Sequence, residues 1–95
     1  MALNLNHQTV EQFAIRLWTR VLLAYQAGDK YTYHRLVWYL WTKIQSGDIT
    51  SDQARVAHNT VFNKTLNTAQ WNSLVSTRLV PMKDRYLALL AENGL

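Results

Sequence analysis

The sequence contains no cysteine, one proline and three glycines in 95 residues. Without cysteine the chain can form neither a disulfide scaffold nor a thiolate zinc site, and we expect it in a reducing cytoplasm. We expect no signal peptide, because polar residues follow Met1 without an apolar run. Lysine or arginine interrupts the longest apolar-rich segments, so we also expect no membrane span.

Residue patterns that carry chemistry are also scarce. The histidines lie far apart in the sequence, at His7, His34 and His58, and none has a partner at the helical spacing of a metal site. No glycine-rich loop is present to bind a phosphate. We therefore expect a protein that is not an enzyme, with no catalytic residue, cofactor, metal or small-molecule substrate. His58 shares an apolar helical stripe with Ala54 and Ala57, which predicts a core histidine rather than a ligand.

The charge balance is modestly positive, with ten Lys and Arg residues against six Asp and Glu, a net charge of +4. The first 45 residues hold five of the basic residues and only two of the acidic ones. An excess of this size suits an acidic protein partner or a nucleic acid equally well, and it is too small for a polybasic tail.

Helix signals dominate the rest of the sequence and predict an all-α fold, a compact layer-on-layer bundle of about five short helices. We expect one domain over 1–95, with 1–8 as a candidate flexible N-terminal arm. Capping boxes are predicted where Thr, Thr or Asn precedes a Gln by three residues: Thr9 with Gln12, Thr50 with Gln53, and Asn67 with Gln70. The helices are expected at about 9–27, 30–46, 51–63, from 68 onward, and 81–93. Asp29 is the expected cap of the second, and Pro81 the expected first residue of the last.

The helix expected at 30–46 is unusually rich in aromatic residues. On a helical wheel, one face is an ordinary core stripe: Tyr33, Leu36, Val37, Leu40 and Ile44. Aromatic residues also lie on the opposite face, so this helix is either the central core helix or an interface. The interface hypothesis assigns partner binding to aromatic and basic residues of the first half of the chain: Tyr31, His34, Arg35, Trp38, Tyr39 and Trp18.

Two functions remain open from the sequence. The first is a small non-enzymatic protein–protein interaction module (an inhibitor, adaptor or assembly factor) that forms a homodimer; such small proteins without catalytic motifs are common among phage-encoded regulators. The alternative is a DNA-binding regulator in which the third and fourth helices form a helix-turn-helix. It would read base edges and anchor phosphates through six residues: Gln70, Ser73, Thr77, Arg78, Lys83 and Arg85. Stacking of unpaired bases on the aromatic residues is less favoured, because such platforms are usually built from strands.

Overall fold

The computed structural model describes residues 9–94, and these residues form helices and no strand. The elements follow one another as α1 (Val10–Gln26), α2 (Lys30–Ser46), α3 (Ser51–Phe62), α4 (Thr68–Leu74), the π-helical segment η1 (Val75–Leu79) and α5 (Met82–Glu92). The prediction of a compact all-α domain is confirmed. The candidate arm at 1–8 lies outside the described residues.

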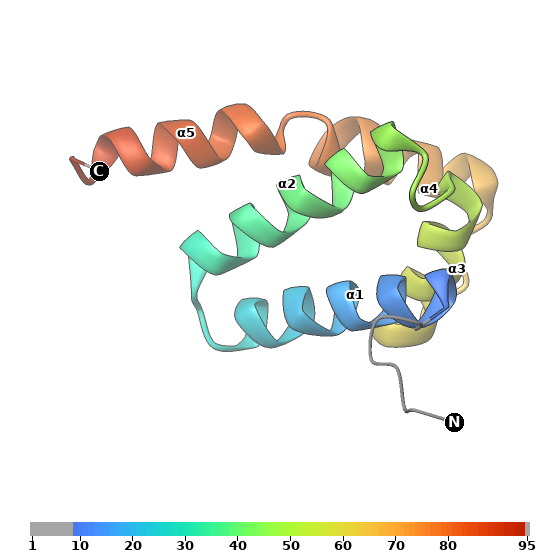
Figure 1. Ribbon diagram of the computed structural model, residues 1–95. Helices are drawn as coiled ribbons and strands as arrows, with labels where there is room; N and C mark the ends of the chain where they lie inside the picture. The colour runs from blue at the N-terminus through green and yellow to red at the C-terminus, as the bar shows by residue number, and fades with distance from the viewer. Residues whose placement is uncertain (1–8, 95) are drawn as a thin grey trace, which may run out of the picture.

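Helix α2 is the central element of the bundle (Figure 1). It returns alongside α1 as the second arm of a hairpin, and α5 packs along its other side. Helix α3 packs against α1, while α4 and η1 close the end of the bundle that is far from the α1–α2 turn. The segment 30–46 is therefore a central helix, as one of the two sequence interpretations has it, with α1 and α5 packed on two of its sides.

The helix ends form as the sequence predicts. All three capping boxes are present, with the N-cap oxygen accepting the N–H three residues on and the glutamine accepting the N-cap N–H. Asp29 caps α2 by accepting a hydrogen bond from the Thr32 N–H at 3.1 Å. Gly47 ends α2 with φ of 86°, a left-handed conformation that residues with a Cβ rarely adopt. Pro81 is the N-cap of α5 and Met82 is the first helical residue, so the helix begins one residue later than predicted.

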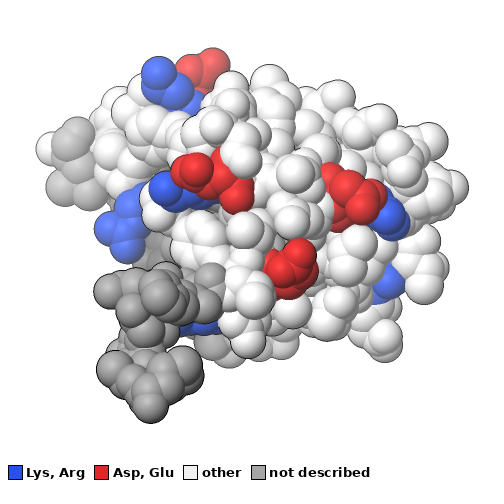
Figure 2. Space-filling view, turned by 45° about the vertical axis from the view of Figure 1, so that its right-hand side comes forward, with Lys and Arg blue, Asp and Glu red and all other residues white. Residues whose placement is uncertain are grey.

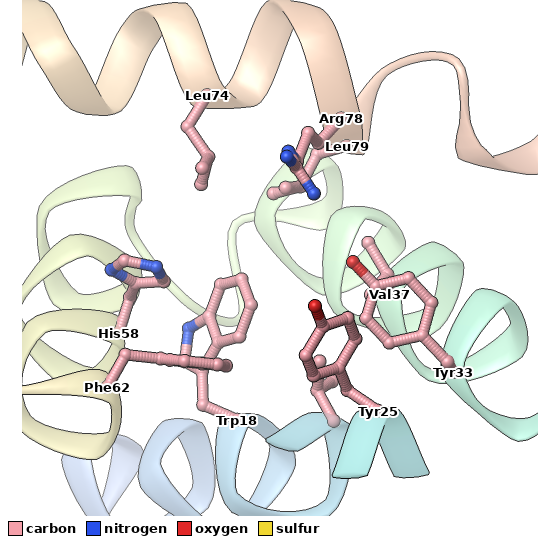
Figure 3. Close-up of a pocket in the computed structure, with 10 residues that line it drawn as sticks. Trp18, Tyr25, Tyr33, Val37, His58, Phe62, Leu74, Arg78 and Leu79 are labelled. Carbon is pink, nitrogen blue, oxygen red and sulfur yellow. The ribbon is translucent and has the colours of Figure 1, made fainter. Parts of the chain in front are cut away.

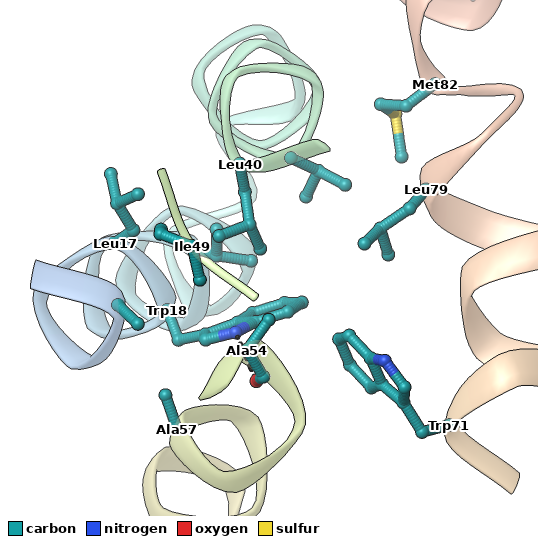
Figure 4. Packing of buried hydrophobic residues seen from close by; sticks show 12 residues of the cluster. Leu17, Trp18, Leu40, Ile49, Ala54, Ala57, Trp71, Leu79 and Met82 are labelled. Atoms are coloured by element: carbon teal, nitrogen blue, oxygen red, sulfur yellow. Dashed lines mark hydrogen bonds between the residues drawn. The ribbon is translucent and has the colours of Figure 1, made fainter. Parts of the chain in front are cut away.

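Two tryptophans anchor the core between α1, α3 and α4 (Figure 4). The side chains of Trp18 and Trp71 are 3% and 1% exposed, and their rings meet edge to face at 6.1 Å. Both indole N–H groups have acceptors, since Trp18 Nε1 donates to Ala54 O at 3.1 Å and Trp71 Nε1 donates to Ser51 Oγ at 2.8 Å. Because a buried indole N–H without a partner would be costly, these two bonds fix how the rings sit in the core.

The predicted core histidine, His58, lies in this aromatic cluster. Its imidazole stacks on the Phe62 ring at 4.9 Å and meets the Trp18 ring at 5.0 Å. Burial lowers the pKa of His58, and nearby Lys64 lowers it further, against the opposing effect of a hydrogen bond from Nδ1 to the Asn59 side chain. The neutral imidazole is therefore the favoured form in the folded protein.

The segment after α4 is π-helical rather than α-helical. The Val80 N–H bonds to the Val75 carbonyl oxygen, five residues earlier, at 2.9 Å. A π-helix brings residues five apart onto one side, and Leu74 and Leu79 accordingly line the same cavity. This wide turn was not predicted from the sequence, whose apolar spacing there fits an ordinary helix.

Candidate functional site

Trp18 does not belong to an exposed interface, so its assignment to partner binding is wrong. Helix α1, which contains Trp18, carries two neighbouring apolar stripes. Helix α3 packs over the stripe that contains Trp18. The hydrogen bond from its indole to Ala54 O shows how closely α3 approaches. In the folded chain this side chain serves the core and is not available to a partner.

Three further residues of the predicted interface are half-buried by neighbouring groups: Tyr31, His34 and Trp38. The Trp38 ring packs against the core and lies 5.6 Å from the ring of Tyr86 in α5. His34 Nδ1 lies 2.6 Å from Lys30 O, so this nitrogen carries the proton and donates to the carbonyl oxygen. The predicted aromatic face is thus divided, because Tyr86 of α5 packs against Trp38 while other residues of the face stay exposed.

Arg35 and Tyr39 are the predicted interface residues that remain exposed. The Tyr39 side chain is 43% exposed, and the Lys43 ammonium lies 5.3 Å from its ring centroid, a cation–π contact. Residues four apart on a helix are neighbours on its surface, so Arg35 and Tyr39 form one strip. This strip runs along the outer side of α2, on the part of the helix that neither α1 nor α5 covers.

A shallow hollow beside this strip extends the exposed surface onto α1. Leu23, which is 58% exposed, lines the hollow together with Arg20 of α1 and with Arg35 and Leu36 of α2. We name this surface the hairpin face and define it as Arg20, Leu23, Arg35, Leu36 and Tyr39. It combines exposed apolar and aromatic side chains with two guanidinium groups, the composition typical of residues that dominate binding energy.

The acidic residue beside the hairpin face, Asp29, already accepts hydrogen bonds within the chain. Both carboxylate oxygens of Asp29 accept hydrogen bonds from Thr32, at 3.1 Å from the N–H and 2.6 Å from Oγ1. These bonds lower the pKa of Asp29, and the positive charge of Arg35 contributes in the same direction. Asp29 therefore stays ionised as a helix cap, and the hairpin face keeps a net positive charge from its two arginines.

The six residues proposed for DNA binding are all exposed and are spread over α4, η1 and α5. Gln70, Ser73 and Thr77 are exposed, but Gln70 Oε1 accepts the Asn67 N–H at 2.8 Å and Thr77 Oγ1 donates to Ser73 O at 2.8 Å. Arg78 is exposed and also lines a cavity between the helices, and its assignment as a phosphate anchor stays a prediction.

The remaining basic residues of that hypothesis, Lys83 and Arg85, are exposed on the following helix, α5. The face drawn in Figure 2 shows basic and acidic groups scattered over a mostly uncharged surface. No basic stripe runs across this face, and such a stripe is the usual footprint of a nucleic-acid site.

A cavity of about 220 Å³ lies between α1, α2, α3, α4 and η1 (Figure 3). Apolar and aromatic groups make up most of its wall: Trp18, Val21, Val37, Phe62, Leu74 and Leu79. Its polar groups come from Tyr25 and Tyr33, whose rings are 5.9 Å apart, and from His58 and Arg78. This site was not predicted from the sequence. The one available signal was that Tyr25 and Tyr33 flank the Gly28 turn, where a helical hairpin brings them together.

Comparison with protein-family models, with curated proteins and with solved structures finds no match for this chain. Within residues 9–94, no helix combines the length and the apolar character that crossing a membrane requires. Over the same range, no three His, Cys, Asp or Glu side chains gather in a way that could hold a metal ion.

Proposed function

We propose that this chain is a non-enzymatic protein-interaction module that binds an acidic surface of another protein through the hairpin face. The observation that supports the proposal is Leu23, a large apolar side chain 58% exposed in the same hollow as two arginines. A partner that covers this side chain would gain the free energy of its burial.

The chemistry of the face indicates the kind of partner. Arg and Tyr are over-represented among the residues that carry binding energy, and an apolar centre with a charged rim is the usual anatomy of an interface. Arg20 and Arg35 would pair with carboxylates of the partner, and their positive charge would accelerate encounter with an acidic surface. Binding should therefore weaken as the salt concentration rises.

An acidic partner is favoured over a second copy of this chain. A closed dimer with two-fold symmetry pairs one patch with itself, which would bring Arg20 and Arg35 of both copies close together. Like charges placed opposite each other cost free energy. Self-association nevertheless stays a prediction of the sequence. A measurement of mass in solution over a range of concentrations tests it directly.

The first experiment places a photo-crosslinking amino acid at Leu23 and, as a matched control, at Val56, an exposed apolar residue of α3. Crosslinking in cells that contain the native partner should give an adduct from position 23 and none from position 56. The captured protein is then purified and its binding to the unmodified chain is measured in solution, so that capture alone does not count as support.

The second experiment reverses the charge of the hairpin face. The double variant Arg20→Glu/Arg35→Glu should abolish binding of the purified partner, while Lys83→Glu/Arg85→Glu, which changes the net charge equally on α5, should retain most of it. Circular dichroism checks that both variants fold. Equal losses in the two variants would show that only the overall charge matters, and the hairpin face would then not be the binding site.

A further inference from the structure

The cavity between the helices has the composition of a ligand site, and it lies apart from the hairpin face. Its walls are apolar and aromatic, and three of its four polar groups lie on one side, those of Tyr25, Tyr33 and Arg78. Figure 3 shows the phenol oxygens of Tyr25 and Tyr33 pointing toward the same space as the guanidinium group of Arg78. A mostly apolar pocket with a small number of convergent polar groups is the usual form of a small-molecule site.

The size of the cavity limits what can enter. Its volume is about 220 Å³. An engineered apolar cavity of about 150 Å³ holds benzene, and sites for drug-sized ligands begin at about 300 Å³. The space therefore suits a compound with one ring, or a short branched chain, that carries one polar group.

The charge at the cavity indicates what that polar group is. None of the lining residues is Asp or Glu, and within residues 9–94 neither ion pair of the structure involves Arg78. Guanidinium groups bind carboxylates through two parallel hydrogen bonds, which is the strongest pairing available to this side chain. The two phenol hydroxyls could donate to the same anion.

The backbone at the cavity is also unusual. The π-helical segment η1 carries Arg78 and Leu79 to the cavity wall, where they lie with Leu74, the last residue of α4. A regular α-helix would rotate residues five apart onto different sides. π-helical turns are rare and occur frequently at functional sites, and here the turn supplies both the cation and part of the apolar wall.

We propose that this cavity binds a small apolar carboxylate, with the carboxylate on Arg78 and its ring or branched chain against Trp18 and Phe62. This goes beyond the proposed function, because it uses different residues and requires no protein partner. Nothing in the sequence signals such a ligand, since the lining residues come from five separate elements.

The test uses 3-phenylpropionate as the probe and its neutral amide as the matched compound. NMR follows the indole N–H signals of Trp18, in the cavity wall, and of Trp38, outside it. We expect the carboxylate to shift the Trp18 signal and not the Trp38 signal, and the amide to bind at least about tenfold more weakly. Absence of a Trp18 shift at about 10 mM probe would overturn the proposal, since even a millimolar site would be largely filled.

Variants of Arg78 test whether its guanidinium group binds the carboxylate of the probe. Arg78→Gln should weaken binding of 3-phenylpropionate by about tenfold or more, and Arg78→Lys by less. Arg85→Gln removes the same charge on α5, away from the cavity, and should leave the affinity unchanged. If Arg78→Gln and Arg85→Gln bind the probe as the wild type does, Arg78 is not the carboxylate site and the proposal fails.

A second variant tests the cavity itself, independently of charge. Leu74 is half-buried in the cavity wall, so Leu74→Trp should fill the space and abolish the Trp18 shift while keeping the helical circular dichroism spectrum. Probe binding that survives in a folded Leu74→Trp variant would place the compound elsewhere and overturn the proposal. If this variant does not fold, the Arg78 series with its Arg85 control decides alone.

Discussion

Two pairs of aromatic residues differ in how far they are exposed to solvent: Trp18 with Trp71, and Tyr25 with Tyr33. At the closed end, Trp18 and Trp71 are 3% and 1% exposed, and both indole N–H groups donate to acceptors within the fold. At the open end, beside the α1–α2 turn, Tyr25 is 68% exposed and its ring meets that of Tyr33 at 5.9 Å. Chemically similar side chains are locked into the core in one place and left accessible in the other.

The difference shows which aromatic residues are available for binding. A buried tryptophan with its N–H satisfied contributes through area removed from water and through a bond that would be costly to break. An exposed tyrosine contributes little to folding, so its removal should leave the fold intact. Aromatic content alone therefore cannot locate an interface here. Burial and the partner of each polar atom make the distinction.

The largest loss of stability is expected from a substitution in the closed end. Trp71→Ala removes a fully buried ring and should lower the free energy of unfolding by about 3–5 kcal/mol. Domains of this size are stable by about 5–15 kcal/mol, so much of the stability would be lost. Urea denaturation followed by circular dichroism measures the change.

The matched control comes from the open end of the molecule. Tyr25→Ala should change the free energy of unfolding by no more than about 0.5 kcal/mol, because most of the ring is already in water. Similar losses in Trp71→Ala and Tyr25→Ala would contradict the division into closed and open ends.

The sequence allowed the helix ends to be predicted because their signals are local. The capping boxes at Thr9, Thr50 and Asn67 each depend on two residues three apart, and Gly47 follows directly from the end of α2. Such hydrogen bonds form within one turn of helix and require no knowledge of neighbouring elements. The all-α fold follows from them together with the apolar spacing.

Exposure could not be predicted in the same way, because it depends on which helices become neighbours. A helical wheel shows two apolar stripes on α1 but not that α3 covers the stripe with Trp18. The same limit applies to Trp38, where the covering ring of Tyr86 comes from α5, 48 positions further along the chain. The cavity exists only where five elements meet, α1, α2, α3, α4 and η1.

The same contrast between a packed ring and an exposed ring exists within helix α2. Trp38 and Tyr39 are adjacent in sequence, but Trp38 packs against the core and Tyr86, whereas Tyr39 is 43% exposed. Trp38→Ala should lower the free energy of unfolding by about 1–3 kcal/mol, since only part of the ring is buried. Tyr39→Ala should stay within about 0.5 kcal/mol. Thermal denaturation of both variants gives the comparison.

The two variants also separate folding from binding. Because Tyr39 belongs to the hairpin face, Tyr39→Ala should weaken binding of an acidic partner while the fold keeps its stability. Trp38→Ala should instead show its main effect in the unfolding measurement. The opposite pattern, a stable Trp38→Ala variant that loses partner binding, would restore Trp38 to the interface.

The smallest expected effect concerns the pH dependence of the closed end. Burial lowers the pKa of His58 below its ordinary value of about 6.5, so the unfolded chain takes up this proton before the folded chain does. The stabilisation is therefore complete above about pH 6.5 and is lost as the pH falls through the lower pKa of the folded state. The contribution of Asp29, whose pKa is also lowered, would be lost only below about pH 4.

The variant His58→Leu isolates this contribution. Between pH 7 and about pH 5, the free energy of unfolding of the wild type should fall more steeply than that of the variant, because other titrating groups are common to both. Chemical denaturation at several pH values measures the two slopes, whatever the absolute stability of the variant. Parallel curves would mean that His58 takes up a proton as readily in the folded chain as in the unfolded one. The packing of His58 against the Trp18 and Phe62 rings would then not favour its neutral form, and this part of the core would not discriminate against a charged group.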